Sequence, residues 1–296
     1  MGDGDFTDRC PTGIEGFDAI CQGGLVRNSS NVLIGGAGAG KTTFLLQFLW
    51  NGVTMFNENG LYCSFEPDIV ETLKDAMSFK WDFTKLNELE RVKFLKFSPR
   101  TKFSDLKSEL TKMVTKHQIR RICFDPVSVL TLNEENQGKL RDIIFDLTAL
   151  MKRMGVTSIL ADESIEDTIL YREKTSWSDT DILKFLADGV IIFHQSAFSE
   201  EADRSLQITK MRRTNHLRLP VGMRIDESGI DVMRLNGEPF PKVVTNNIQQ
   251  NSLENSSQNG TQQINQEKSI QQTNKQEIQQ TEDKLNVLAG QNTNLN

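Results

Sequence analysis

The segment from Asn31 to Trp50 constrains the fold of this chain more than any other. A short apolar run, Asn31–Ile34, is followed by Gly-Gly-Ala-Gly-Ala-Gly-Lys-Thr at positions 35–42 and then by an apolar-rich run over positions 43–50. The spacing G-x-x-x-x-G-K-[ST] between a strand and a helix lets the glycine-rich backbone wrap around an anion. The segment therefore predicts a buried strand, a phosphate-binding loop and a helix that begins at the loop.

The residue types in this loop predict what it binds. Backbone N–H groups and the positive end of the helix dipole would face a phosphate group. Lys41 would bring a mobile charge to the β- and γ-phosphates, and the Thr42 hydroxyl would bind Mg²⁺. We therefore predict a site for ATP and Mg²⁺, with a flexible turn and an incidental lysine as the alternative. The residues expected at the nucleotide are Gly35, Gly36, Ala37, Gly38, Ala39, Gly40, Lys41, Thr42 and Thr43.

Two acidic residues at the ends of other predicted strands complete the candidate site. Asp125 follows the apolar run Arg121–Phe124 and is predicted to be the second metal residue beside Thr42. Its alternative role is that of a turn former or helix cap. Glu66 ends the run Leu61–Phe65, and we predict that it orients the attacking water during hydrolysis. An ordinary glutamate at a strand end is the alternative.

The order of the apolar runs predicts an α/β fold with a mostly parallel central sheet flanked by helices. Short apolar runs bounded by turn or charged residues indicate buried parallel strands, here at 31–34, 61–65, 121–124 and 157–160. A helix with an apolar stripe is predicted from Leu140 to Met154, where Gly155 ends it. After Ala187 the pattern becomes rich in strands, which predicts a β-rich C-terminal edge at 190–194, 206–211, 221–225 and 230–233.

The composition changes at residue 243. Residues 243–296 contain 12 Gln and 11 Asn, no aromatic residue and no proline. Such a segment buries too little apolar surface to offset the entropy of ordering it. We predict one folded domain over residues 1–242 and a disordered tail over 243–296. A short coiled coil or partner helix is the alternative for the tail, built on Ile264, Ile270, Ile278 and Leu285.

Charge and composition exclude several classes of protein. The chain of 296 residues has a formal net charge of −6 and a pI near 5.3, which argues against general nucleic-acid binding. No apolar run approaches the roughly 18 residues of a membrane span, and the acidic start Met1–Phe6 does not resemble a secretory signal. Four cysteines without C-x-x-C spacing indicate free thiols. We expect a cytoplasmic protein without membrane or DNA partners.

One basic run stands out in this acidic chain. Residues 204–224 contain no Asp or Glu, and their basic residues are Arg204, Lys210, Arg212, Arg213, His216, Arg218 and Arg224. A solvated basic strand edge that discourages aggregation is one interpretation. The functional interpretation is a positive cluster that contacts phosphate across a subunit boundary, as an arginine finger does.

These motifs together resemble the KaiC-like branch of the RecA/RadA ATPase superfamily. The resemblance covers most of residues 11–235. It rests on an opening signature, Pro11–Asp18 followed by Gly23-Gly24-Leu25, and on the P-loop, Phe65-Glu66, Asp125 and the run 210–216, in the family's order. It implies a RecA-like fold and a hexameric ring. Lys210 and Arg212 would reach the γ-phosphate of the neighbouring subunit, with Thr214 and His216 nearby.

Three departures limit what the resemblance implies. Glu66 is followed by Pro67 where such proteins usually carry a second glutamate, Pro126 replaces a small polar residue, and one domain is present. The leading hypothesis is a ring-forming, slow ATPase that acts as a nucleotide-dependent switch on an unidentified protein partner. A non-hydrolysing ATP-binding scaffold is the alternative. A RadA-type DNA recombinase is a third hypothesis, which the acidic composition disfavours.

Overall fold

The computed structural model describes residues 8–66, 68–98, 100–130, 136–163, 179–195, 204–234 and 237–240. The chain divides into two compact units, Met1–Val243 and Val244–Asn296, and all described residues lie in the first. The predicted tail and its four apolar positions lie outside the described residues. Its disorder, and the domain boundary at residue 242, therefore stay predictions.

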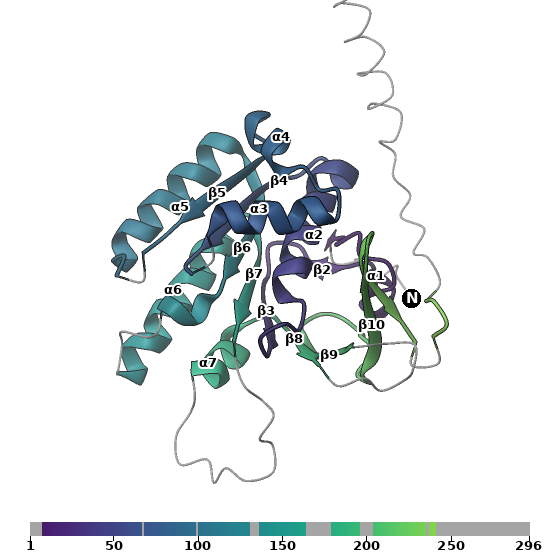
Figure 1. The fold of residues 1–296 in the computed structure, drawn as a ribbon. Helices are drawn as coiled ribbons and strands as arrows, with labels where there is room; N and C mark the ends of the chain where they lie inside the picture. Colours follow the sequence, from purple (N-terminus) through teal and green to yellow (C-terminus); the bar gives the residue numbers. More distant parts are fainter. Residues whose placement is uncertain are drawn as a thin grey trace, which may run out of the picture. The chain divides into compact units, whose positions relative to one another are not determined.

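A nine-stranded sheet forms the centre of the described part of the chain (Figure 1). Its order is β11-β10-β9-β8-β3-β7-β6-β4-β5; the strands from β8 to β5 are parallel, and β9, β10 and β11 add an antiparallel edge. This confirms the predicted α/β class and its β-rich C-terminal edge. The strands are β1 (Arg9–Cys10), β2 (Leu25–Val26), β3 (Ser30–Gly35), β4 (Asn59–Ser64), β5 (Val92–Lys96), β6 (Ile119–Asp125), β7 (Thr157–Asp162), β8 (Gly189–His194), β9 (Arg204–Met211), β10 (Val221–Asp226) and β11 (Gly229–Met233).

The helices cover both faces of this sheet. Side chains of a strand alternate between its two faces, so in β3 Leu33 belongs to one apolar cluster, whereas Val32 and Ile34 belong to the other. The first cluster is completed by α1, α2, α3 and α4, and the second by α5, α6 and α7. The helices are α1 (Phe17–Ile20), α2 (Lys41–Phe56), α3 (Ile69–Ser78), α4 (Phe83–Glu88), α5 (Phe103–His117), the 3₁₀ turn η1 (Val127–Leu130), α6 (Gln137–Arg153) and α7 (Asp179–Leu186).

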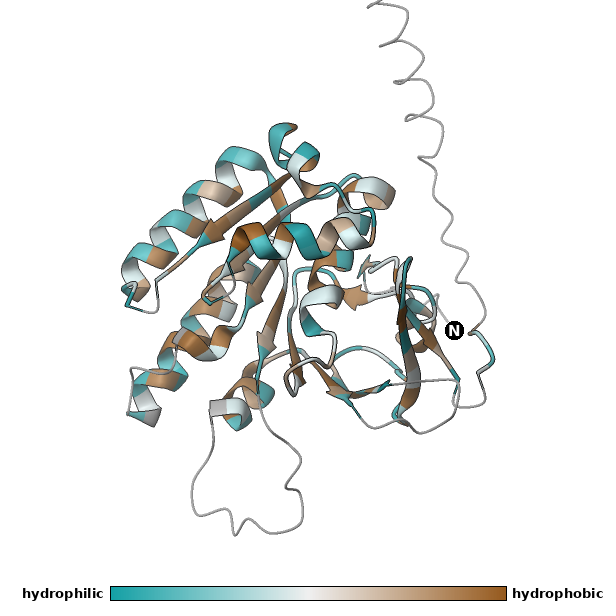
Figure 2. Cartoon of the chain, in the orientation of Figure 1, coloured by the Kyte–Doolittle hydropathy of each residue, from teal (hydrophilic) through white to brown (hydrophobic). Residues whose placement is uncertain are grey.

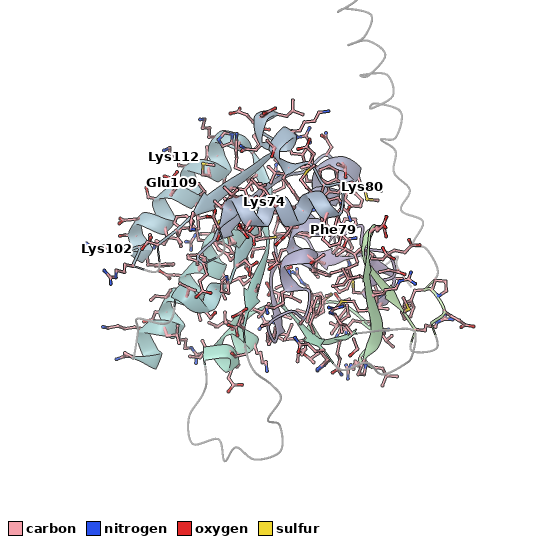
Figure 3. The ribbon with its side chains drawn as sticks, in the orientation of Figure 1. Lys74, Phe79, Lys80, Lys102, Glu109 and Lys112 are labelled. Atoms are coloured by element: carbon pink, nitrogen blue, oxygen red, sulfur yellow. The ribbon has the colours of Figure 1, made fainter. Side chains whose placement is uncertain are left out.

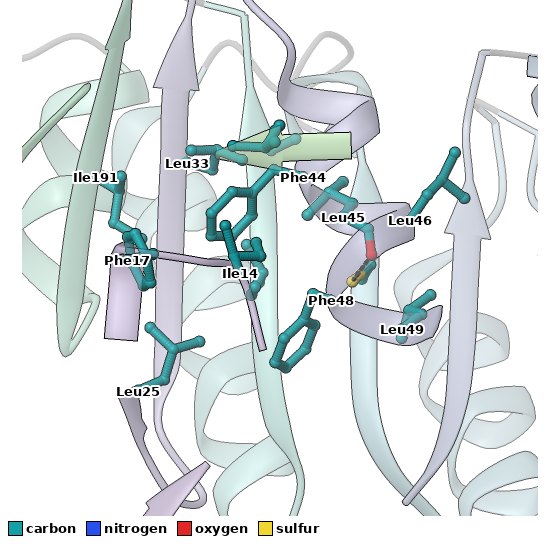
Figure 4. Packing of buried hydrophobic residues seen from close by; sticks show 14 of the residues in the cluster. Ile14, Phe17, Leu25, Leu33, Phe44, Leu45, Leu46, Phe48, Leu49 and Ile191 are labelled. Carbon is teal, nitrogen blue, oxygen red and sulfur yellow. Dashed lines mark hydrogen bonds between the residues drawn. The ribbon is translucent and has the colours of Figure 1, made fainter. Parts of the chain in front are cut away.

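Helix α2, which follows the phosphate-binding loop, is the most deeply buried helix segment of the first face. The Phe44 ring lies edge-on to Phe17 and to Phe193, with centroids 5.2 and 5.6 Å apart, and Leu33 and Phe48 pack around them (Figure 4). Edge-to-face pairs of this kind add to the free energy gained by burying the rings. The packing fixes the start of α2 relative to the sheet.

Polar and charged residues lie on the outer sides of the helices, while the sheet strands are predominantly apolar (Figure 2). Three labelled side chains in Figure 3 are accessible to solvent: Lys74 on α3, and Glu109 and Lys112 on α5. The ion pair between Lys112 and Glu109 spans 3.7 Å at the surface, where such pairs contribute little to stability. The outer sides of α3 and α5 are therefore the solvated faces of these helices.

Helix α6 ends where the sequence predicts, at Arg153 shortly before Gly155, and a side-chain cap marks its start. Asn136 caps its first turn, because the side-chain oxygen accepts hydrogen bonds from the N–H groups of Gly138 and Lys139. Strand β5 at the edge of the sheet was not predicted, because it has only five residues and two of them are lysines. So short a run without strict alternation carries little signal of its own.

The opening signature folds into a turn that packs against the last strand. The Asp18 carboxylate accepts hydrogen bonds from the Thr12 N–H and hydroxyl and from the Gly13 N–H, at 2.9, 2.7 and 2.9 Å. Gly16 has φ +78°, and a Cβ there would lie 1.8 Å from the Val232 carbonyl oxygen. Only glycine therefore allows this turn to approach β11 so closely.

The four cysteines, Cys10, Cys21, Cys63 and Cys123, are free and buried, which confirms the prediction of free thiols. Burial raises the pKa of each; that of Cys10 rises to about 11. In the folded chain these side chains act as small apolar groups.

A charged pair lies inside the first unit at the amino end of β6. The Arg121 side chain is fully buried; its Nε donates to Glu58 Oε2 at 2.6 Å and its Nη1 donates to the Phe48 carbonyl at 3.1 Å. Arg27 pairs with the other oxygen of Glu58. Burial disfavours the ionised carboxyl, but the charges of Arg121 and Arg27 outweigh it and lower the pKa of Glu58.

Glu58→Gln is expected to lower the free energy of unfolding by about 3–5 kcal/mol, because it leaves the buried Arg121 charge unpaired. Equilibrium unfolding in urea at pH 7 measures this, and Glu88→Gln on the exposed end of α4 is the matched control. Because the folded pKa of Glu58 is lowered, its stabilisation is present above its unfolded pKa of about 4.3 and is lost as pH falls through the folded pKa. Equal losses from the two variants would contradict the assignment.

Candidate functional site

The phosphate-binding loop lies at the carboxyl edge of the parallel sheet. It connects β3, which is paired on both sides with parallel strands, to the start of α2 at Lys41. A cavity of about 430 Å³ opens there, and its lining residues are Gly38, Gly40, Lys41, Thr42, Thr43, Glu163, Arg204 and Ile225. Five of the nine loop residues predicted to contact the nucleotide therefore line one cavity. The other four, Gly35, Gly36, Ala37 and Ala39, belong to the same loop.

Gly40 shapes the mouth of this cavity. It has φ +98°, a conformation that favours glycine, and a Cβ there would lie 2.7 Å from Ile225 Cδ1, which would have to move. It is also the N-cap residue of α2, and it supplies no side-chain acceptor to the first-turn N–H groups. A helix start of this kind can bind an anion such as phosphate.

Lys41 holds its charge within the loop. Its side chain is only 6% exposed, and Nζ donates to the Gly35 and Gly36 carbonyl oxygens at 2.8 and 2.9 Å. Glu163, just after β7, lies 3.7 Å from the same nitrogen. Sequence reasoning missed Glu163, although an acidic residue three positions after the predicted strand 157–160 was a signal that could have found it.

The two predicted metal residues lie in contact. The Thr42 hydroxyl donates to Asp125 Oδ2 at 2.7 Å, and Asp125 is buried at the end of β6. A hydroxyl and a carboxylate side by side form the hard oxygen donor set that suits Mg²⁺ held with phosphate oxygens and water. The residues therefore fit this ion, whose bound form would neutralise charge developing on the phosphates.

Tyr62 on β4 is a further residue of this site that the sequence did not reveal. Its hydroxyl donates to the same Asp125 Oδ2 at 2.6 Å, and its side chain is fully buried. Burial, and then the charge of Asp125, raise the pKa of Tyr62 well above its usual value near 10, so the phenol stays a hydrogen-bond donor. An aromatic residue in an apolar strand gives no sign of such a contact.

Glu66 lies at the same edge of the sheet but does not line the cavity. Strand β4 ends at Ser64, which is level with Asp125 of β6, and the Phe65 N–H donates to the Asp125 carbonyl at 3.0 Å. Glu66 is the next residue and is exposed. The predicted base, Glu66, thus follows directly after a residue whose main chain is hydrogen-bonded to Asp125.

The predicted basic residues divide between the two edges of the sheet. Strand β9 runs antiparallel to β8, so Ser205 lies level with His194 near the loop and Met211 lies level with Gly189 at the opposite edge. Arg204 reaches the loop, where its Nε donates to the Gly38 carbonyl at 3.3 Å. Lys210 follows six residues later, about 20 Å away at roughly 3.4 Å per residue, and Arg212 lies two residues beyond it.

At the opposite edge lie the four residues predicted to act at a neighbouring subunit, which are Lys210, Arg212, Thr214 and His216. Each of them contacts its own chain. Lys210 Nζ donates to the Lys184 and Phe185 carbonyls at the end of α7, both at 3.0 Å. Arg212 Nη1 lies 3.6 Å from Asp188, the Thr214 hydroxyl accepts from Arg9 at 2.7 Å, and His216 Nδ1 lies 3.1 Å from the Leu217 carbonyl. None of the four lines the cavity at the loop of the same chain.

Comparison with known proteins shows the family of this chain. The family model described as "ATPase: KaiC" matches residues 10–237. The chain belongs to this KaiC ATPase family. The match includes the opening turn, the loop and all strands of the nine-stranded sheet.

Curated KaiC relatives are similar over most of this chain. It is 31% identical over 233 residues to the circadian clock oscillator protein KaiC of Synechococcus elongatus, which covers 76% of this chain and 44% of the relative. The corresponding protein of Prochlorococcus marinus subsp. pastoris is 29% identical over 236 residues, covering 77% and 45%. The chain therefore spans less than half the length of these KaiC relatives.

A solved structure of a KaiC-like protein shows the same fold. PH0186 of Pyrococcus horikoshii OT3 superposes with a TM-score of 0.65 at 28% identity, covering 76% of this chain and 99% of that one. This confirms the predicted RecA-like architecture of the KaiC family. Among the residues described in this chain, no helix is long and apolar enough to span a membrane.

Proposed function

We propose that this chain is a Mg²⁺-dependent ATPase that assembles into a homo-oligomeric, hexameric ring with ATP sites between subunits. The position of Lys210 and Arg212 carries this proposal. They lie at the amino edge of the sheet, whereas the loop of the same chain lies at the carboxyl edge. A basic pair that lies about 20 Å or more from its own loop is suited to reach the loop of a neighbour.

In the proposed reaction each residue has a distinct role. The loop N–H groups and Lys41 bind and orient the β- and γ-phosphates, while Thr42 and Asp125 would hold Mg²⁺. Glu66 would orient a water molecule for attack, and it would accept the proton of that water. Arg212 and Lys210 of the neighbour would stabilise the charge on the γ-phosphate, with Thr214 and His216 supporting them.

We further propose slow turnover and a switching role on a protein partner in the cytoplasm. Glu66 is followed by Pro67, so this position has one acidic residue where KaiC-like proteins usually carry two consecutive glutamates. This observation also favours the second candidate function, a scaffold that binds ATP without hydrolysing it. Phosphate release separates the two, because a scaffold would bind ATP at the same site and release none.

Native mass spectrometry of the full chain with and without Mg·ATP tests the assembly. A hexamer that forms or tightens with Mg·ATP, together with slow phosphate release, is the expected result. A monomer under every condition would overturn the ring, and a ring without phosphate release would establish the scaffold. Strong, salt-dependent binding to DNA would instead favour the recombinase hypothesis.

A further inference from the structure

Tyr62 makes a contact that the proposed roles above do not use. Its phenol is fully buried and lies between the metal residue Asp125 and helix α3. On the helix side, the Thr72 side chain lies beside the phenol, and Thr72 is itself only 2% exposed. The hydroxyl therefore lies between two elements that flank the candidate metal site.

The contact leaves one oxygen of Asp125 for other partners. Both hydroxyls, those of Thr42 and Tyr62, donate to Oδ2, at 2.7 and 2.6 Å. Two short bonds to the same oxygen fix the torsion of the carboxylate, because rotation would break both. Oδ1 then keeps a constant direction, in which it can accept from the water shell of the ion.

Helix α3, on the other side of the phenol, begins shortly after Glu66 in the sequence. Helix α3 begins at Ile69, its N-cap residue Asp68 accepts from the Val70 N–H at 3.0 Å, and the Thr72 hydroxyl donates to the Asp68 carbonyl at 3.1 Å. Asp68 is two residues beyond Glu66. Thr72 thus lies beside the phenol, and its hydroxyl bonds the start of the helix that follows the predicted base.

We propose that Tyr62 is a positioning residue of the metal site, which orients Asp125 toward the ion. This inference rests on the proposed function, because it assumes that Thr42 and Asp125 hold Mg²⁺. Hydrogen-bond partners of metal-binding groups typically contribute 10- to 100-fold to metal affinity. Tyr62 belongs to the same class of residue.

Tyr62→Phe is expected to weaken Mn²⁺ binding to the nucleotide complex by about 10-fold or more, because the ring is kept and only the hydroxyl is lost. Electron paramagnetic resonance of Mn²⁺ with a non-hydrolysable ATP analogue measures this without turnover. The affinity for ADP in EDTA serves as the control within the same variant, and it is expected to stay unchanged. A loss of equal size in both would overturn a specific role at the metal.

A double-mutant cycle tests the contact between Tyr62 and Asp125 without metal or nucleotide. Tyr62→Phe, Asp125→Asn and the double variant are compared by urea unfolding in EDTA, and we expect their effects on unfolding to be coupled. Additive effects would overturn the contact. If Mn²⁺ does not bind to the wild-type nucleotide complex at all, the proposed function fails; if it binds equally to wild type and Tyr62→Phe, only this inference fails.

Discussion

Arg212→Ala is expected to slow ATP hydrolysis by about 10³- to 10⁵-fold and to change ATP affinity little, as for other arginine fingers. The Arg212 side chain is 55% exposed beside Asp188, at the sheet edge opposite the loop of its own chain. Its loss therefore leaves the cavity at the loop of the same chain intact. Phosphate release and nucleotide titration measure the two quantities separately. Arg218→Ala, another exposed arginine of the basic run, is the control and is expected to retain turnover.

Mixed rings test whether Arg212 acts on a neighbour. Subunits with Arg212→Ala keep an intact loop, and subunits with Lys41→Ala keep an intact Arg212. Mixing them creates interfaces in which both intact parts face each other, so some activity should return. Mixed rings that form but show no recovery would contradict a contact between subunits, and an equal loss from Arg218→Ala would indicate a general effect of charge.

Lys41→Ala is expected to weaken ATP binding by at least about 100-fold, since hydrogen bonds between charged groups contribute about 1.5–3 kcal/mol each. The Lys41 ammonium lies within the loop and would bind two phosphate groups. Isothermal titration calorimetry measures the affinity.

The fold is expected to survive this change. The two short partners of Lys41 are main-chain carbonyls of its own loop, and Glu163, 3.7 Å away, has an exposed side chain. Lys74→Ala on the outer side of α3 is the matched control for loss of a lysine. Unchanged ATP affinity in a folded Lys41→Ala protein would contradict the assignment of the loop.

The sequence predicts best those parts whose residues are contiguous. The loop at positions 35–42 and the strand and helix around it form one local unit, so a single motif specifies all three. The apolar runs of β3, β6 and β7 are equally clear, because strands buried on both faces carry few polar residues. The fold class follows from their order along the chain.

Parts of the site that depend on tertiary contacts could not be predicted in the same way. Tyr62 and Asp125 are 63 residues apart, and their contact exists because β4 and β6 are neighbours in the sheet. The basic run gives a similar case. Its sequence shows seven basic residues together, but only the antiparallel direction of β9 brings Arg204 to the loop and leaves Arg212 at the other edge.

Burial of all four native thiols makes the folded protein well suited to site-directed labelling. Maleimides and spin labels react with thiolates, which these side chains form poorly because each has a raised pKa and lies away from solvent. A cysteine introduced on the outer side of α3 or α5 would then be the preferred point of attachment, without removal of the native ones. Two differently labelled populations of subunits could be followed as they exchange, so the composition of mixed rings would be read directly from each particle.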